Sequence, residues 1–143
     1  MDNRANRLGP PRNATPKKSK GSRMKIRNLT KNATICKDAL PADTFWRRTR
    51  GLMFRQQWND FDGLILSPCG SIHTFWMRMA IDVCFISPDN RILSVAAELA
   101  PWRIAFGKKG SKTTLELPAG TLENTNTTAG DQLAFQTETK REN

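Results

Sequence analysis

The stretch that decides the fold is HTFWMRMAIDVCFI, residues 73–86. Most of its residues are apolar, and Arg78 and Asp82 are its only charged residues at neutral pH. The run is shorter than the ~18 residues that a membrane-spanning helix needs, and it is rich in the aromatic and β-branched residues of buried strands. We therefore expect two strand pieces with a bend near Ala80, placed centrally in a sheet.

Shorter apolar segments on both sides of this run, separated by turn residues, predict further strands. Polar residues 28–32 form the turn of a predicted hairpin, and a basic loop is expected over 101–112. One short helix is predicted over 44–50, ended by Gly51, and a helical turn or loop over 121–128. The predicted strands are 24–29, 34–37, 64–66, 91–97, 113–117 and 132–136. This order favours an α+β fold, with a small mainly antiparallel sheet or partly closed β-barrel and one or two short helices.

Length and composition are typical of one globular domain. The chain has 143 residues, of which 38% are apolar and 25% charged, and its three cysteines do not suggest a disulfide framework. No apolar run is long enough to span a membrane, and the first thirty residues lack the apolar core of a secretory signal. We therefore expect a soluble cytoplasmic protein without a transmembrane segment.

Positive charge is concentrated at the N-terminus. The formal net charge is +10, and residues 1–31 hold ten Lys or Arg against one acidic residue. Residues 1–23 combine this charge with three prolines and few apolar side chains, so we predict a disordered basic tail. Met24 opens an alternating segment, which leaves open that the native chain starts there. From residue 24 to 143 we predict a single domain.

Three separated motifs, RTRGLMFR (48–55), HTFWMRMAIDVCFI (73–86) and LELPAG (115–120), are followed by Gly130 and Asp131. In this order and spacing they resemble the domain of unknown function 192 family, over about residues 29–135. The resemblance implies a small β-rich domain with a helix, found mainly in bacteria and archaea, and it implies no known activity. Family members often have a glycine, a methionine and an apolar run where this chain has DGLIL (62–66), a change that we expect to affect packing only. Many relatives look exported behind a signal or anchor, a feature that we do not expect in this chain.

Arg78 and Asp82 are unusual because they carry opposite charges within an apolar stretch. A buried charge without a partner is costly, so each must find a partner or face a cleft. An ion pair of Arg78 with Asp82 or Glu116 is the structural interpretation. The functional interpretation is a polar floor for an anionic or carbohydrate-like ligand, since guanidinium groups suit planar oxyanions.

His73 is the only histidine, and it follows Cys69 by four residues. The pair could act as nucleophile and base, or bind a metal together with Cys84. The spacing matches no standard metal motif, and buried apolar cysteines with a hydrogen-bonded histidine remain the alternative. We expect no metal and no cofactor.

These patterns favour a non-catalytic accessory domain that binds a small polar or anionic ligand, or a partner segment, on a concave polar and aromatic face. One alternative is an enzyme in which His73 acts with Cys69, Asp82 or Glu116. Another is weak, salt-sensitive binding of nucleic acid through residues 1–23. The predicted ligand-binding residues are His73, Trp76, Arg78, Asp82, Trp102, Arg103 and Glu116.

Overall fold

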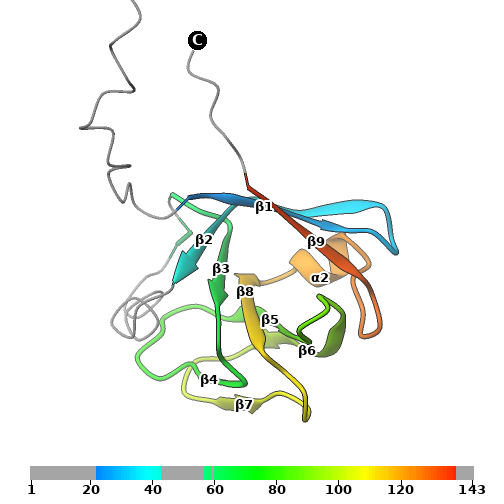
Figure 1. Ribbon diagram of the computed structural model, residues 1–143. Helices are drawn as coiled ribbons and strands as arrows, with labels where there is room; N and C mark the ends of the chain where they lie inside the picture. Colours follow the sequence, from blue (N-terminus) through cyan, green and yellow to red (C-terminus); the bar gives the residue numbers. More distant parts are fainter. Residues whose placement is uncertain (1–21, 43–56, 59, 138–143) are drawn as a thin grey trace, which may run out of the picture.

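The computed structural model describes residues 22–42, 57–58 and 60–137 (Figure 1). Nearly all of the predicted basic tail and the whole predicted helix over 44–50 lie outside these ranges. Nine strands and one short helix are present in the described part of the chain. They are β1 (Met24–Asn28), β2 (Ala33–Ala42), β3 (Gly63–Leu66), β4 (Ser71–His73), β5 (Ile81–Ile86), β6 (Ile92–Leu99), β7 (Ile104–Phe106), β8 (Thr113–Pro118), α2 (Thr121–Asn124) and β9 (Leu133–Thr137).

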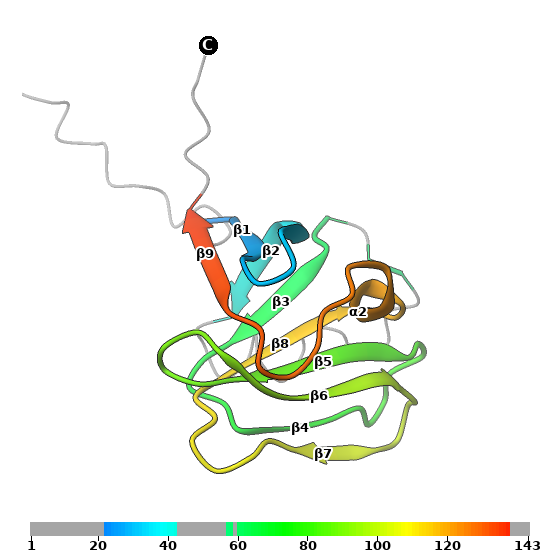
Figure 2. The same cartoon turned by 90° about the vertical axis from the view of Figure 1, so that its right-hand side faces the viewer.

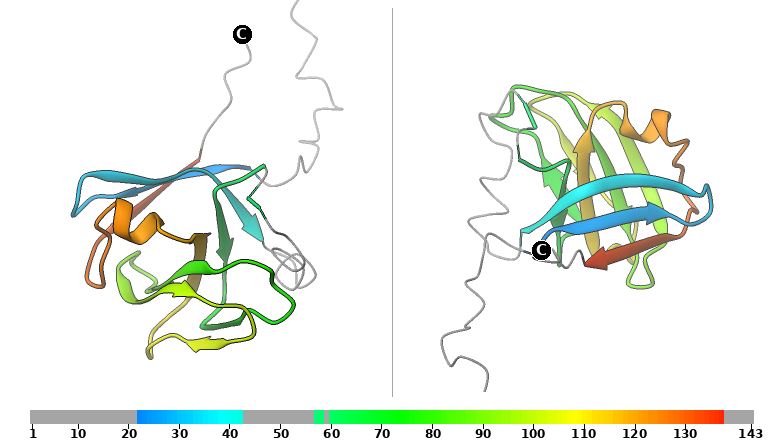
Figure 3. Two further views of the ribbon diagram at one scale, coloured as in Figure 1. Left: turned by 180° about the vertical axis from the view of Figure 1, so that it is seen from behind. Right: turned by 90° about the horizontal axis from the view of Figure 1, so that it is seen from above.

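Seven strands form one mixed sheet in the order β6-β5-β8-β3-β2-β1-β9. All neighbours are antiparallel except β2 and β3, which are parallel and are joined by the long connection that a crossover requires. The sheet curves so that β1, β2 and β9 cross over the ends of the other strands, as the view from above in Figure 3 shows. The described residues form a mainly antiparallel half-barrel with one short helix, which confirms the predicted fold class.

The central strands bury both of their faces. Alternate residues of β8 and β5 divide between two apolar clusters, because successive side chains of a strand point to opposite faces. Leu115 and Leu117 belong to the inner cluster, which is enclosed by the half-barrel together with α2. Val83 and Phe85 belong to the outer cluster on the opposite face.

A separate two-stranded sheet, β4 and β7, covers the outer cluster (Figure 2). Ile72 and Ala105 are opposite one another in this sheet, and both pack into the outer cluster. The small sheet is therefore a second layer over the main sheet. Among the described residues, no helix has the length and apolar content needed to cross a bilayer.

Two local predictions differ from the structure. Residues 73–86 hold one long buried strand, β5, and only the end of β4, because residues 74–80 turn rather than extend. The predicted basic loop over 101–112 contains β7, whose three residues are too few for a sequence pattern to reveal. The remaining predicted strands and the helical turn over 121–128 are confirmed, with boundaries shifted by a few residues.

Candidate functional site

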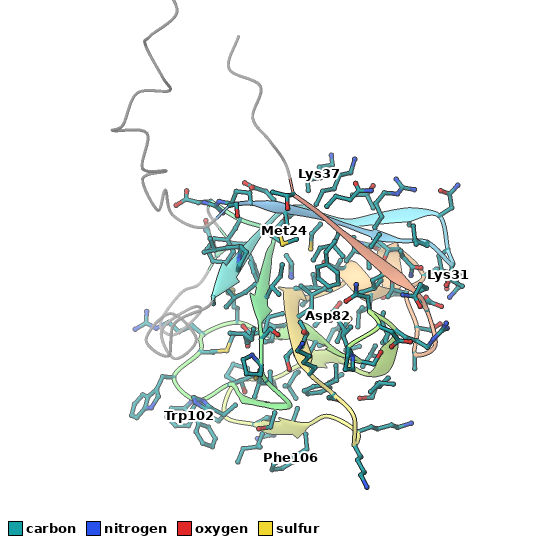
Figure 4. The ribbon with its side chains drawn as sticks, in the orientation of Figure 1. Met24, Lys31, Lys37, Asp82, Trp102 and Phe106 are labelled. Atoms are coloured by element: carbon teal, nitrogen blue, oxygen red, sulfur yellow. The ribbon has the colours of Figure 1, made fainter. Side chains whose placement is uncertain are left out.

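The outer side of the β4–β7 layer is unusually apolar. Ile104 and Phe106 lie on β7 with their side chains turned away from the core, and they are 53% and 76% exposed. Alternation along a strand requires this orientation, because Ala105 between them packs inward. Figure 4 shows Phe106 and Trp102 along the same lower edge of the molecule, far from Met24 and Lys37.

Thr74 fixes the two loops that adjoin this layer. Its side chain is fully buried, and its hydroxyl donates a hydrogen bond to the Ala100 carbonyl (2.7 Å) and accepts one from the Arg103 amide (2.9 Å). Its carbonyl accepts hydrogen bonds from the amides of Met77 and Trp102. One buried residue therefore holds the loop after β4 against the loop before β7.

The two loops present Trp76 and Trp102 to solvent. Both are about half exposed, and both have positive φ, 66° and 64°. A bulky residue in this region is a genuine outlier, and such strain persists only where the surrounding structure enforces it. The two rings meet edge to face with centroids 4.7 Å apart, and Phe75 adjoins Trp102 at 5.8 Å. We call Phe75, Trp76, Trp102, Ile104 and Phe106 the outer apolar surface.

Three predicted site residues accompany this surface. His73 is opposite Ile104 in the β4–β7 register, and its ring stacks on Phe75 with centroids 5.0 Å apart. Arg78 and Arg103 are exposed in the same two loops as the tryptophans. The structure therefore brings together an aromatic cluster and exposed guanidinium groups, which can bind a ligand with a flat apolar face and an anionic group.

Asp82 is not part of this arrangement. It points to the inner face of the sheet and is 1% exposed, and its carboxylate accepts hydrogen bonds from the amides of Leu122 (2.9 Å) and Glu98 (2.8 Å). Arg78 forms no ion pair with Asp82 or Glu116, so that prediction is wrong. Backbone donors satisfy the buried carboxylate because α2 and the end of β6 bring unpaired amides to it.

Glu116 lies on the outer face of β8, between Leu64 of β3 and Val83 of β5. It is 7% exposed, and no side chain among the described residues forms an ion pair or hydrogen bond with it. Burial raises the pKa of this carboxyl to about 8, because desolvation disfavours the charged form. Glu116 is therefore mostly protonated at neutral pH. It lies on the face of the main sheet that carries the outer cluster.

The cysteines do not form a site with His73. The Cys69 thiol donates to the Ser71 carbonyl (3.0 Å), while the His73 Nδ1 accepts a hydrogen bond from the Phe75 amide (3.3 Å). Cys84 is buried in the inner cluster, on the other side of the sheet, where desolvation raises the pKa of its thiol to about 12. In the described ranges, no three His, Cys, Asp or Glu side chains converge as metal ligands would.

Sequence reasoning therefore identified His73, Trp76, Arg78, Trp102 and Arg103 as neighbours, whereas Asp82 and Glu116 lie elsewhere. It missed Thr74, Ile104 and Phe106. The alternation Ile-Ala-Phe over 104–106 was the available signal for the two exposed apolar residues, but it is too short to distinguish a strand from a loop. No sequence pattern predicts that a threonine will be buried and will join two loops by hydrogen bonds.

The fold and the outer apolar surface together define a class of protein: a small half-barrel domain whose outer layer is apolar and is accompanied by exposed basic residues. Residues 24–135 match the family model DUF192, described as "Uncharacterized ACR, COG1430", and the chain belongs to this family. The match confirms the resemblance that the three sequence motifs indicated.

Relatives of this chain are known from archaea. It is 32% identical to a UPF0127 protein of Thermococcus sibiricus, over 70% of this chain and 67% of that protein. It is also 32% identical to a UPF0127 protein of Pyrococcus furiosus, over 76% of this chain and 95% of that protein.

Solved structures share the fold. A protein of unknown function from Novosphingobium aromaticivorans superimposes with a TM-score of 0.67 at 19% identity, over 78% of this chain and 83% of that one. A Sinorhizobium meliloti protein superimposes with the same TM-score at 22% identity, over 79% of this chain and 92% of that one. At such identities the similarity shows the fold alone.

Proposed function

We propose that this chain is a non-catalytic binding domain, which recognises an anionic ligand or partner at the outer apolar surface. The observation that carries the proposal is the pair of half-exposed tryptophans, each at positive φ and in ring contact. Backbone strain and apolar exposure both oppose folding stability, so their combination supports a binding role. The concave shape of this face stays a prediction.

Exposed cationic groups support the anionic character of the ligand. Arg78 and Arg103 belong to the loops that carry the tryptophans, and guanidinium groups bind carboxylate and phosphate through paired hydrogen bonds. The proposed compartment is the cytoplasm.

A fluorescence titration tests the proposal. Tryptophan emission should change on addition of glucose 6-phosphate and change much less with glucose, because only the former offers an anionic group. The variant Trp102→Gly should lose this response while keeping its stability, since glycine adopts positive φ without strain.

The matched control is Asn90→Gly, at another positive-φ position in the turn between β5 and β6. This variant should keep the full response. A Trp102→Gly protein that responds like the parent, or a parent that responds to neither sugar and to no other anion, contradicts the proposal.

The buried Glu116 is the one observation that favours the enzyme alternative, because a carboxyl with a strongly raised pKa is typical of general acids. In that alternative, Cys69 or His73 would supply the second group. Alkylation of Cys69 by iodoacetamide at the rate of an ordinary exposed thiol would exclude it as an activated nucleophile.

Nucleic-acid binding through residues 1–23 falls outside the described residues and stays a prediction. Deletion of these residues should abolish any such binding, measured as a salt-dependent affinity.

A further inference from the structure

We propose that the outer apolar surface docks on a lipid bilayer that carries anionic headgroups. The inference rests on the proposed function, since it names the source of the anionic groups that this surface recognises. Three properties of the surface support the proposal: its exposed apolar area, the positive charge of its segments and the hydrogen bonds that hold its loops together.

Exposed apolar side chains concentrate on this one layer. Of the six large hydrophobic residues that are exposed among the described residues, Trp76, Trp102, Ile104 and Phe106 lie here. Ile104 and Phe106 offer no hydrogen bond to a small polar ligand, and they gain free energy only by leaving water for an apolar medium. A bilayer provides that medium over the whole layer at once. Tryptophan is also the side chain most typical of membrane–water interfaces.

The segments that build this layer carry charge of one sign, although the exposed Glu98 on β6 directly precedes one of them in the chain. Residues 68–81 and 99–115 build the β4–β7 layer and its loops, and they contain no Asp or Glu. These segments carry five exposed basic residues: Arg78, Arg103, Lys108, Lys109 and Lys112. Basic residues beside an apolar patch are attracted to anionic headgroups, and the cytoplasmic leaflet is rich in such lipids. The surface therefore complements an anionic bilayer in both polarity and charge.

Thr74 makes the surface rigid before it binds. The hydrogen bonds of this residue join the loop of Trp76 to the loop of Trp102, so little conformational entropy is lost on docking. The layer also lies at the end of the molecule away from β1 and β9, where a flat bilayer can approach it (Figure 1).

Vesicle co-sedimentation of the full chain tests the proposal. We expect binding to vesicles of phosphatidylcholine with phosphatidylserine, and much weaker binding to phosphatidylcholine alone. Phe106→Ser should lower the partition coefficient about tenfold, which is the effect of withholding one large apolar side chain from the bilayer. Its control is Leu29→Ser, which removes a side chain of 54% exposure from another part of the surface and should leave binding unchanged.

A second pair of variants tests the charge. Lys108→Gln with Lys109→Gln should weaken binding roughly fivefold per lysine, and added salt should reduce this difference. The matched control, Lys25→Gln with Lys37→Gln, alters two lysines of β1 and β2 and should change binding far less.

Each contrary outcome has its own meaning. If both variant pairs leave vesicle binding unchanged, the basic residues 1–23 are responsible for the binding and the proposal is overturned. If soluble glycerophosphoserine changes the tryptophan emission but vesicles do not bind, the proposed function stands and the bilayer is wrong. If the variants weaken binding to single-stranded DNA but vesicles do not bind, the partner is a nucleic acid. If no anion binds the surface, both proposals fail.

Discussion

The two ends of this domain differ in which groups they bury and which they expose. At the α2 end, Asp82 and Asp131 are buried, and backbone or side-chain donors satisfy both carboxylates. At the β4–β7 end, Phe106 and the tryptophans are exposed although they are apolar.

The α2 end shows how buried polar groups stabilise a fold. Asn28 donates a hydrogen bond to Asp131 (2.8 Å) and another to Thr127 (3.1 Å), which joins β1 to the loop after α2. Lys31 forms an ion pair with the same carboxylate (3.1 Å). These contacts and the amides around them lower the pKa of Asp131, although burial acts in the opposite direction. Every partner comes from within the fold, whereas the β4–β7 end leaves large apolar side chains exposed to solvent.

Asp82→Ala is expected to lower the free energy of unfolding more than any other change considered for the two ends. This change leaves the amides of Leu122 and Glu98 buried without an acceptor, so the free energy of unfolding should fall by about 3 kcal/mol or more. Arg78→Ala, at the exposed end, should change it by less than about 0.5 kcal/mol. Urea denaturation measures both. A similar loss for Arg78→Ala would contradict the separation of the two ends.

Glu116→Gln should change the pH dependence of stability. The pKa of Glu116 is about 8 in the folded chain and near 4.5 ordinarily, so between these values the native state binds more protons than the unfolded state. The contribution of Glu116 to the free energy of unfolding is therefore complete below about pH 4.5. It is lost as the pH rises towards 8, by at most about 1.4 kcal/mol per pH unit. The amide of the variant does not titrate, so the variant should gain stability relative to the parent over this range. Parallel stability curves between pH 5 and 8 would show that Glu116 is ionised in the native state.

Thr74→Val removes the hydroxyl that joins the two tryptophan loops while keeping the shape of the side chain. Loss of the hydrogen bonds of this hydroxyl should lower the free energy of unfolding by about 1–3 kcal/mol, and the effect should concentrate at the β4–β7 end. Amide hydrogen exchange should accelerate at Trp102 and Arg103 but not at Leu122. Uniform acceleration throughout the domain would mean that Thr74 supports the whole fold.

The smallest effect on stability is expected from Phe106→Ser. The side chain is 76% exposed, so its replacement should change the free energy of unfolding by less than about 0.5 kcal/mol. The thermal midpoint measures this change. A larger loss would show that Phe106 contributes to the core, and it would weaken the interpretation of the outer apolar surface as a binding surface.

The sequence predicts the fold better than the site. Apolar runs and turn residues define strands of four or more residues, because a buried strand needs a continuous pattern, as 81–86 shows. Asp82 and Glu116 differ in a way that no pattern reveals. Both are acidic residues in buried strands, but the partners of Asp82 are amides from distant segments, and Glu116 has no such partner among the described residues. The positive φ of Trp76 and Trp102 likewise follows from tertiary contacts rather than from residue type.

The most direct test of the central claim is an amide NMR map of the full chain titrated with nanodiscs that contain phosphatidylserine. We predict that signals of residues 71–79 and 101–112 shift or broaden first, while those of α2, β1 and β9 stay unchanged. Perturbation at the α2 end, or within residues 1–23 only, would contradict the assignment of binding to the outer apolar surface.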